Sequence, residues 1–452
     1  MLVDQDGKQY LDALAGLWNV LVGHGRRELA DAAAKQMSTL AYASSYSGST
    51  NRPAIELAER LDASCYPGIG RFFFTSGGAE ANESAFKTAR FFWKLQGKPD
   101  KTKIISRTFA YHGTTMAAMS ATGLNAYWPM FEPRVPGFLH IESPYPYRFV
   151  GKKSSLDDAR TPGQQAADLL EEAILREGAD TVAAFIGEPV QGAGGVIVPP
   201  DDYWPRIRKI CDRHQVLLIA DEVITGFGRT GKPFGLMHYS AAEKLGQAPR
   251  HQTQTADAAN SARSQSHVSS HFSAAHGIEP DIITLAKGLT SGYFPMGAMG
   301  VNEKIGAAIE SASGPTTWMQ AFTYSSHPVG CAVALANLAL IESEGLYERG
   351  AKLGARLQRG LQTLASHPHV GEVRGLGTMA AVEFVADKTT KAEFPAEQQV
   401  GQRIHQAAQD RGMFTRLRGD VFNFAPCYIA ADGQIDRMVN ILGESIEAVL
   451  GN

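Results

Sequence analysis

The sequence has little excess charge, few cysteines and no long apolar run, and each shortage excludes a class of protein. Its 452 residues carry 43 Lys and Arg against 46 Asp and Glu, a net charge of −3. This balance argues against nucleic acid as the main partner. The four cysteines (Cys65, Cys211, Cys331 and Cys427) form no C-x-x-C pair, which suits a reducing compartment better than a disulfide framework. No apolar stretch approaches the roughly 20 residues that span a bilayer, so we expect no membrane partner.

The N-terminal residues and the overall composition favour a globular protein. The start, MLVDQDGKQYLDALAG, has no basic segment followed by an apolar one, so we expect no secretory signal. An apolar fraction of 44% in a chain of this length can form a sizeable core, in one large domain with a lobe or in two to three domains. We therefore expect a soluble, cytoplasmic protein.

Apolar runs alternate with helical patterns through the first two thirds of the chain. Strands are expected at 103–109, 181–190, 216–223 and 280–289, and helices at 163–178 and 200–215. Continuous apolar strands separated by helices predict an α/β fold with a mostly parallel sheet covered on both faces. Such sheets bind ligands beyond the carboxyl ends of their strands, which is where Glu188, Asp221 and Lys287 fall.

The last third of the chain has a different character. Residues 330–366 predict two successive helices, 370–385 two antiparallel strands with a Gly-rich turn, and 420–429 a further strand. We assign residues 42–329 to a large ligand-binding domain and 330–452 to a smaller α+β domain. Residues 1–41 are expected to be an N-terminal segment of the small domain.

Residues 240–271 interrupt the large domain with Ser, Ala, Gln and His in place of large apolar side chains. Such a segment cannot bury much surface, so an inserted polar loop is expected. Its histidines (His251, His267 and His271) fit no metal-ligand spacing, and we expect no metal site.

Two carboxylates, Asp221 and Glu222, follow the apolar run LLIA. An ionised carboxylate taken out of water is costly unless a positive group meets it. No Lys or Arg follows until Arg229, so the partner of Asp221 must come from elsewhere in the chain or from a ligand.

Lys287 ends another apolar strand, just before a Gly-rich turn. Such a lysine can simply reach out to water along its aliphatic stem. It can also be desolvated, with a lowered pKa, and form a Schiff base with an aldehyde.

Two further segments bear on the same site. The turn Ser76–Ala79 follows three Phe and leads into a helix expected to begin near Glu80, and a helix N-terminus of this kind favours phosphate. Many α/β proteins have such turns, so the signal is weak alone. Tyr111 and His112 lie in a loop after a strand, where an aromatic ring either packs or stacks on a flat ligand.

Pyridoxal phosphate needs all of these groups at once. It requires a lysine for its aldehyde, an anion-binding turn for its phosphate, an aromatic face for its ring and a carboxylate for its pyridinium nitrogen. Taken together, the segments predict a pyridoxal phosphate site in which the ring nitrogen is the cation opposite Asp221.

The chain resembles the class III, or omega, aminotransferases of pyridoxal-phosphate fold type I. The resemblance covers nearly the whole chain outside the inserted loop. LAGLWNVLVGHGR near the start resembles in particular the branch that pairs amines or omega-amino acids with pyruvate. The motifs that carry the resemblance are SGGAEAN, YHG, GEPVQGAGG, DEVITGFGRTG, AKGLTSGYFPMGA and FTYSSHPVGCA.

That resemblance implies a role for each of several residues. Lys287 would be the Schiff-base lysine and general acid/base, and Asp221 would pair with the ring nitrogen. Substrate would meet Trp18, Tyr111 and the mobile Arg416, which grips a carboxylate, with Arg418 as the competing candidate. Further cofactor contacts would come from Gly78, Ala79, Tyr111, His112, Glu188, Val223, Phe322 and Thr323.

The implied partners are a small-molecule amine, a keto acid acceptor and a second copy of the chain. Thr323 would reach the phosphate site of the other subunit in a homodimer, which could pair further into a tetramer. The implied reaction is a ping-pong transfer of an amino group from an amine or omega-amino acid to a keto acid, pyruvate above all.

Some features depart from the family pattern, and other functions compete. Relatives often have Ser at Ala79, and most carry a further segment before DGKQYLDALAG that would support the first strand and the substrate mouth. An aminomutase, a racemase or a decarboxylase would use the same lysine and aspartate. A non-catalytic binding protein of this fold would usually have lost one of them.

Overall fold

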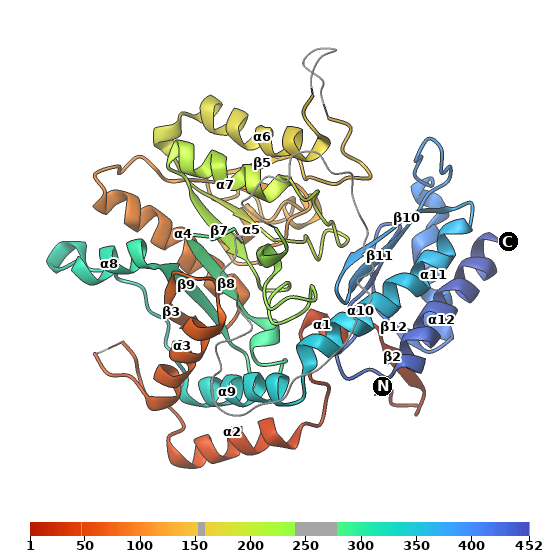
Figure 1. The fold of residues 1–452 in the computed structure, drawn as a ribbon, viewed down its shortest axis with the longest axis horizontal. Coiled ribbons are helices and arrows are strands. Elements are labelled where there is room, and N and C mark those ends of the chain that lie inside the picture. The colour runs from red at the N-terminus through yellow and green to blue at the C-terminus, as the bar shows by residue number, and fades with distance from the viewer. Residues whose placement is uncertain (47, 152–158, 240–277, 452) are drawn as a thin grey trace, which may run out of the picture.

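A seven-stranded sheet forms the centre of the larger part of the molecule (Figure 1). The computed structural model describes residues 1–46, 48–151, 159–239 and 278–451. The strands from β8 to β5 run parallel, whereas β9 is antiparallel to both of its neighbours, so the predicted mostly parallel sheet is confirmed. In spatial order the strands are β3 (Ile69–Thr75), β9 (Gly297–Asn302), β8 (Ile282–Leu285), β7 (Leu217–Asp221), β6 (Val182–Gly187), β4 (Lys103–Arg107) and β5 (Phe138–Ile141).

Helices cover both faces of this sheet, and the alternation of side chains along β7 shows why. Leu217 and Ile219 pack into one apolar cluster with α4, while Leu218 and Ala220 pack into another with α6 and α7. Both faces are therefore buried, as the continuous apolar runs predict. The helices of this part are α2 (Arg27–Thr39), α3 (Arg52–Ser64), α4 (Gly78–Leu95), α5 (Met116–Ala121), α6 (Pro162–Glu177), α7 (Tyr203–His214), α8 (Glu303–Ser311) and α9 (Pro328–Ser343).

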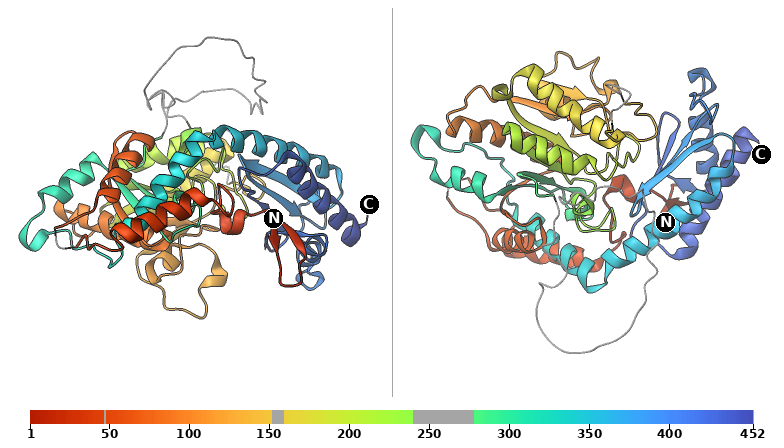
Figure 2. Two further views of the ribbon diagram at one scale, coloured as in Figure 1. Left: turned by 90° about the horizontal axis from the view of Figure 1, so that it is seen from below. Right: turned by 45° about the horizontal axis from the view of Figure 1, so that its top comes forward.

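A four-stranded antiparallel sheet with helices on it forms the smaller part. Figure 2 shows this part at one end of the molecule, with β1–β2 and the last helix both on it. The two helices, the hairpin and the later strand expected from the sequence are all present. The elements are α10 (Leu346–Gln362), β10 (Val370–Leu376), β11 (Met379–Phe384), α11 (Val400–Asp410), β13 (Arg416–Arg418), β14 (Val421–Phe424) and α12 (Asp432–Leu450).

The N-terminal residues contribute to both parts of the molecule. The strand β2 (Gln9–Asp12) pairs in parallel with β12 (Met413–Phe414), and Leu11 joins the apolar core of the small part. The short strand β1 (Leu2–Val3) completes this edge. After the short turn α1 (Ala15–Trp18), Leu29 of α2 joins the core of the large part.

Helix α9 bears on where the two domains divide. Its buried face, including Val329, Cys331 and Ile341, belongs to the apolar cluster of the large sheet, and α9 packs against α2 and α3. We therefore propose that the large domain includes α2 and extends through α9. The boundary between the two domains would then lie between α9 and α10, and not between residues 329 and 330 as the sequence suggests.

Two observations concern segments outside this description. Residues 240–271, including the three histidines, lie outside the described residues. Within the described part of the chain no helix is by itself long and apolar enough to cross a membrane. The helices Pro328–Ser343 and Leu346–Ser366 together have the length and composition of a membrane span, but a bend of 67° separates them.

Candidate active site

A cavity of about 190 Å³ opens at the carboxyl ends of β4, β6, β7 and β8. This is the edge of the sheet at which the sequence places Glu188, Asp221 and Lys287, and all three line it. The other lining residues come from the start of α4, from the loop after β4 and from the ends of β7 and β8. They are Gly78, Ala79, Asn82, Tyr111, His112, Gly113, Thr114, Val223, Ile224 and Ala286.

The two adjacent carboxylates at the end of β7 point to opposite sides of the sheet. Asp221 continues the Leu217–Ile219 face and points toward α4. Glu222 lies on the other side, where it accepts hydrogen bonds from the Tyr66 and Thr225 hydroxyls and from two backbone N–H groups. Burial nevertheless raises the pKa of the Glu222 carboxyl. Glu222 therefore ties down the following loop, and only Asp221 faces the cavity.

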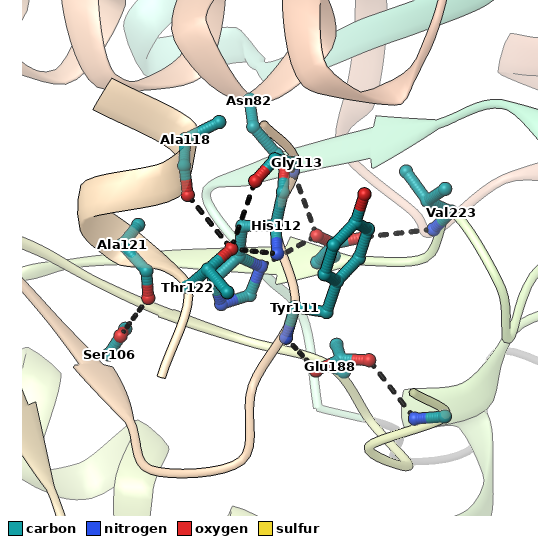
Figure 3. Close-up of polar contacts among 12 residues, drawn as sticks. Asn82, Ser106, Tyr111, His112, Gly113, Ala118, Ala121, Thr122, Glu188 and Val223 are labelled. Atoms are coloured by element: carbon teal, nitrogen blue, oxygen red, sulfur yellow. Dashed lines mark hydrogen bonds and ion pairs between the residues drawn. The ribbon is translucent and has the colours of Figure 1, made fainter. Parts of the chain in front are cut away.

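Three donors from this chain hold the buried carboxylate of Asp221 (Figure 3). His112 Nδ1 lies 2.7 Å from Asp221 Oδ2, and Asn82 Nδ2 lies 2.9 Å from the same oxygen. The backbone N–H of Val223 donates to Oδ1 at 3.1 Å. Asp221 thus has partners from elsewhere in the chain, which is one of the two sources that the sequence leaves open. No local pattern in the sequence indicates these partners, because Asn82 and His112 are distant from Asp221 in the chain.

His112 is fixed in turn by its own backbone contacts. Its N–H donates to Thr122 Oγ1 at 2.9 Å, and its carbonyl accepts from Asn82 Nδ2 at 2.7 Å. The Thr122 hydroxyl lies 3.0 Å from the Ala118 carbonyl, its other acceptor being Gly113. His112 Nε2 is buried without a hydrogen-bond partner among the described residues. The backbone of His112 is thus held by Asn82 and Thr122, and its ring is held through Nδ1 on Asp221.

The Gly-rich turn brings backbone close to the cavity. Helix α4 begins at Gly78, two residues earlier than expected, after the extended Gly77 and without a side-chain cap. Its first N–H groups have no partners within the helix, and its dipole is positive at this end. Space is tight, since a Cβ on Gly78 would lie 3.0 Å from both γ-carbons of Val223. A Cβ on Gly113 would lie 2.7 Å from that of Ala79, and the φ of Gly113 is +131°.

Lys287 enters the cavity from a strained position. Its φ is +44°, in the left-handed region that non-glycine residues rarely occupy. Burial lowers the pKa of its amine, the nearby Asp221 and Glu188 carboxylates oppose that shift, and Arg416 adds to it. This shift favours the desolvated form of the lysine, one of the two interpretations open from the sequence.

Glu188 lies next to this lysine and is also fully enclosed. One carboxylate oxygen accepts from the Tyr111 N–H and the other from the Gly192 N–H, both at 3.0 Å. Burial raises the pKa of Glu188 to about 7, with His112 acting against the shift and Asp221 adding to it. Behind it, the buried Arg107 donates to the Glu188 backbone carbonyl.

The remaining site residues named from the sequence are more scattered. The Tyr111 ring lies at the cavity, 5.6 Å from the Tyr127 ring, and burial raises its pKa. Trp18 is 1% exposed, in an apolar cluster between the two parts of the molecule, and does not line the cavity. Phe322 packs on Phe73, and Thr323 is exposed outside the cavity.

Arg416, which the resemblance implies to be mobile, lies in the edge strand β13 (Arg416–Arg418). Its backbone pairs with Asn423 of β14. The side chain of Arg416 does not line the cavity. Its charge nevertheless acts on Tyr111 and Lys287, which do line it. A strand of three residues is too short for its alternation to be recognised in the sequence.

The residues present fit pyridoxal phosphate. The cavity holds a desolvated lysine, a buried carboxylate kept in place by three donors, an aromatic ring and the N-terminus of an 18-residue helix. A fold of type I with this set of groups defines a pyridoxal-phosphate-dependent transferase.

Comparison with known proteins identifies the family. The model of the class-III aminotransferases matches residues 1–245 and 269–446, so the interruption falls in the expected insertion. The chain belongs to this family and is a pyridoxal-phosphate-dependent aminotransferase.

Individual relatives are similar over almost the whole chain. The diaminobutyrate–2-oxoglutarate transaminase of Halomonas elongata is 38% identical over 97% of this chain and 86% of its own length. The putrescine–pyruvate aminotransferase of Pseudomonas aeruginosa is 38% identical over 98% of this chain and 88% of its own length. An (S)-enantioselective omega-transaminase from Thermomicrobium roseum, of known structure, is 45% identical. The match covers 99% of this chain and 90% of the other, with a TM-score of 0.85.

Proposed function

We propose that this aminotransferase moves an amino group from an amine or omega-amino acid to pyruvate. The observation that carries the proposal is that Lys287 and Asp221 line one cavity and that the charge of Arg416 acts on Lys287. Two relatives support the choice of substrates, because one is named a putrescine–pyruvate aminotransferase and another an omega-transaminase.

Lys287 carries the proton in this proposal. Bound pyridoxal phosphate supplies the aldehyde that takes up the amino group and the electron-poor ring that accepts electrons from the substrate carbon. An amine whose pKa is lowered by burial is neutral at a lower pH and can accept a proton from that carbon. The same amine then returns the proton to a different atom from the one that lost it. Lys287 would therefore act first as general base and then as general acid.

Asp221 supplies a fixed negative charge for the ring nitrogen. Its position does not depend on the cofactor, because His112, Asn82 and Val223 already hold it. Preorganised charge of this kind costs little reorganisation during a reaction. The N–H groups of Gly78 and Ala79 at the start of α4 would hold the phosphate, with Val223 and Tyr111 on the two faces of the ring.

A second copy of the chain completes the site in this proposal. Thr323 is exposed and lies outside the cavity of its own chain, so a cofactor contact from it requires another subunit. Dimers are typical of the family. Phe322 would accompany Thr323.

Arg416 would bind the carboxylate of the keto acid. Its guanidinium can grip a carboxylate through two parallel hydrogen bonds. The same cavity must serve both half-reactions of a ping-pong cycle, so this side chain has to withdraw when the donor has no carboxylate. Arg416 is partly exposed and has no ion pair among the described residues, which leaves it free to do so.

The test is an incubation of cofactor-loaded protein with 1-phenylethylamine and pyruvate. We expect alanine and acetophenone to form in equal amounts. Lys287→Ala should keep its fold by circular dichroism and form no alanine, because it lacks the group that moves the proton. Borohydride reduction should attach the cofactor to Lys287 in the wild type, and attachment to another lysine would refute the assignment.

A further inference from the structure

Two arginines project from one face of the edge strand β13. Arg416 and Arg418 are two residues apart in an extended strand, so their side chains leave it on the same side. Leu417 between them packs on the opposite side, against the core of the small domain. Both arginines face the large domain, because Arg418 stacks on Phe109 and the charge of Arg416 acts on Tyr111 and Lys287.

Arg418 has no counter-charge in contact with it. Its guanidinium carbon lies 4.3 Å from the centre of the Phe109 ring, and no hydrogen bond or ion pair joins its side chain to another described residue. Glu383 is the carboxylate with the largest electrostatic effect on Arg418. It already accepts hydrogen bonds from Tyr145, Arg148 and Arg374. Burial lowers the pKa of Arg418, and the neighbouring Arg374 adds to that shift.

The surroundings of Arg418 are connected to the candidate active site. Phe109, on which it stacks, lies two residues before Tyr111 in the same loop. Its Nη1 lies 3.6 Å from where a Cβ on Gly195 would be, and Gly195 follows the Gly192 N–H that binds Glu188. Arg418 thus contacts the loop that carries Tyr111 and lies beside the loop that follows Glu188, whereas it is Arg416 whose charge acts on Lys287.

We propose that Arg418 is a second carboxylate-binding residue, specific for substrates whose carboxylate is several carbons from the reacting carbon. This inference rests on the proposed function and extends it. Residues two apart along a strand are separated by about 7 Å, so the two guanidinium groups sample different distances from Lys287. Arg416 serves a carboxylate adjacent to the reacting carbon, and Arg418 serves the distal carboxylate of an omega-amino acid.

The energetics of Arg418 favour this role. A half-buried guanidinium that has only an aromatic ring beside it is stabilised far less than one in a bidentate pair with a carboxylate. The side chain gives up little when it leaves Phe109 for an anion. The hairpin that carries it is short, since Gly419 and Asp420 alone connect β13 to β14, so the backbone stays in place while the side chain moves.

The experiment compares two donors that differ only in the carboxylate. 4-Aminobutyrate and 1-aminobutane have the same four-carbon chain, and each is assayed with pyruvate as acceptor. In Arg418→Met we expect kcat/KM for 4-aminobutyrate to fall about tenfold or more, mainly through KM, as for a lost charge-assisted pair. The values for 1-aminobutane and the KM for pyruvate should stay within about twofold. Arg359→Met, which removes an exposed arginine of α10, is the control and should change none of them.

A binding measurement separates this inference from the proposed function. Glutarate carries two carboxylates and no amine, so its binding to cofactor-loaded protein can be followed by calorimetry without turnover. We expect Arg418→Met to weaken glutarate about tenfold and to leave propionate unchanged. Equal losses for both acids, or no loss for glutarate, would overturn the role of Arg418. Failure of the wild type to aminate pyruvate with any donor would refute the proposed function, and the glutarate comparison would still decide the role of Arg418.

Discussion

The end of β7 places a charged side chain in the cavity and the edge strand β13 carries two charged side chains outside it, and the two elements hold these charges differently. Asp221 is buried and has three hydrogen-bond donors on its two oxygens. Arg416 and Arg418 are half-buried and have no ion pair among the described residues. The first arrangement fixes a charge in one position, and the second leaves charges able to move.

This difference matches two demands on the site. The groups that hold a cofactor meet the same ligand in every cycle, so a rigid shell reduces the reorganisation needed for reaction. The groups that meet substrate face a carboxylate in one half-reaction and an uncharged substituent in the other. A fixed buried cation would be left unpaired against the second, which is costly.

The comparison is tested most severely at Asp221. We expect Asp221→Asn to retain the cofactor but to lower kcat about 100-fold or more, because the facing ring nitrogen loses its counter-charge while the neighbouring donors stay in place. Absorbance of the bound cofactor together with steady-state kinetics measures both quantities. Near-normal turnover with full cofactor content would show that this charge is not needed.

A pair of glycine substitutions compares the rigidity of the two regions directly. In Gly113→Ala the new Cβ would meet Ala79 at 2.7 Å in a backbone with φ of +131°, and we expect about 2 kcal/mol of lost stability with weaker cofactor binding. Gly419→Ala, in the turn after β13, has a φ of +55° but no atom within 4 Å of the new Cβ. It should cost no more than about 1 kcal/mol. Denaturant unfolding of both variants measures the difference, and equal losses would argue against the contrast.

Arg416 should show a loss confined to one substrate. We expect Arg416→Ala to raise the KM for pyruvate about tenfold and to leave that for 1-phenylethylamine nearly unchanged. If Arg418→Ala produces the pyruvate defect instead, the two arginines have exchanged the roles given to them above. A defect for both substrates would mean that Arg416 supports the fold of β13.

The smallest effect is expected from Glu188, through pH. Its pKa of about 7 in the folded protein exceeds the ordinary value of a free carboxyl, so the folded state keeps a proton that the unfolded state has released. Stability is therefore lost as pH rises from about 4.5 to 7 and changes little from this group above that. In cofactor-free protein we expect the free energy of unfolding of Glu188→Gln, relative to that of the wild type, to rise between pH 5 and 8. A difference that does not change with pH would contradict the raised pKa.

Sequence alone predicted much of the fold, because apolar runs such as those of β6, β7 and β8 are long enough to be distinct. It also placed Asp221, Glu188 and Lys287 at one edge of the sheet, since parallel strands end together. It missed the start of α4, where Gly77 offers no capping side chain. It could not predict that Asn82 and His112 hold Asp221, because partners 139 and 109 residues away leave no local pattern.

The opposite directions of Asp221 and Glu222 have a consequence for how this sequence can vary. The residues before them are all apolar, so exchanging one for another of similar volume should be tolerated on either face of β7. Losing or gaining a single residue in the strand is a different kind of change, because it would turn Glu222 toward the cavity and Asp221 toward Tyr66. Chain length in β7 is therefore under a stricter constraint than side-chain identity, and we expect insertions and deletions among working variants to fall outside Leu217–Asp221.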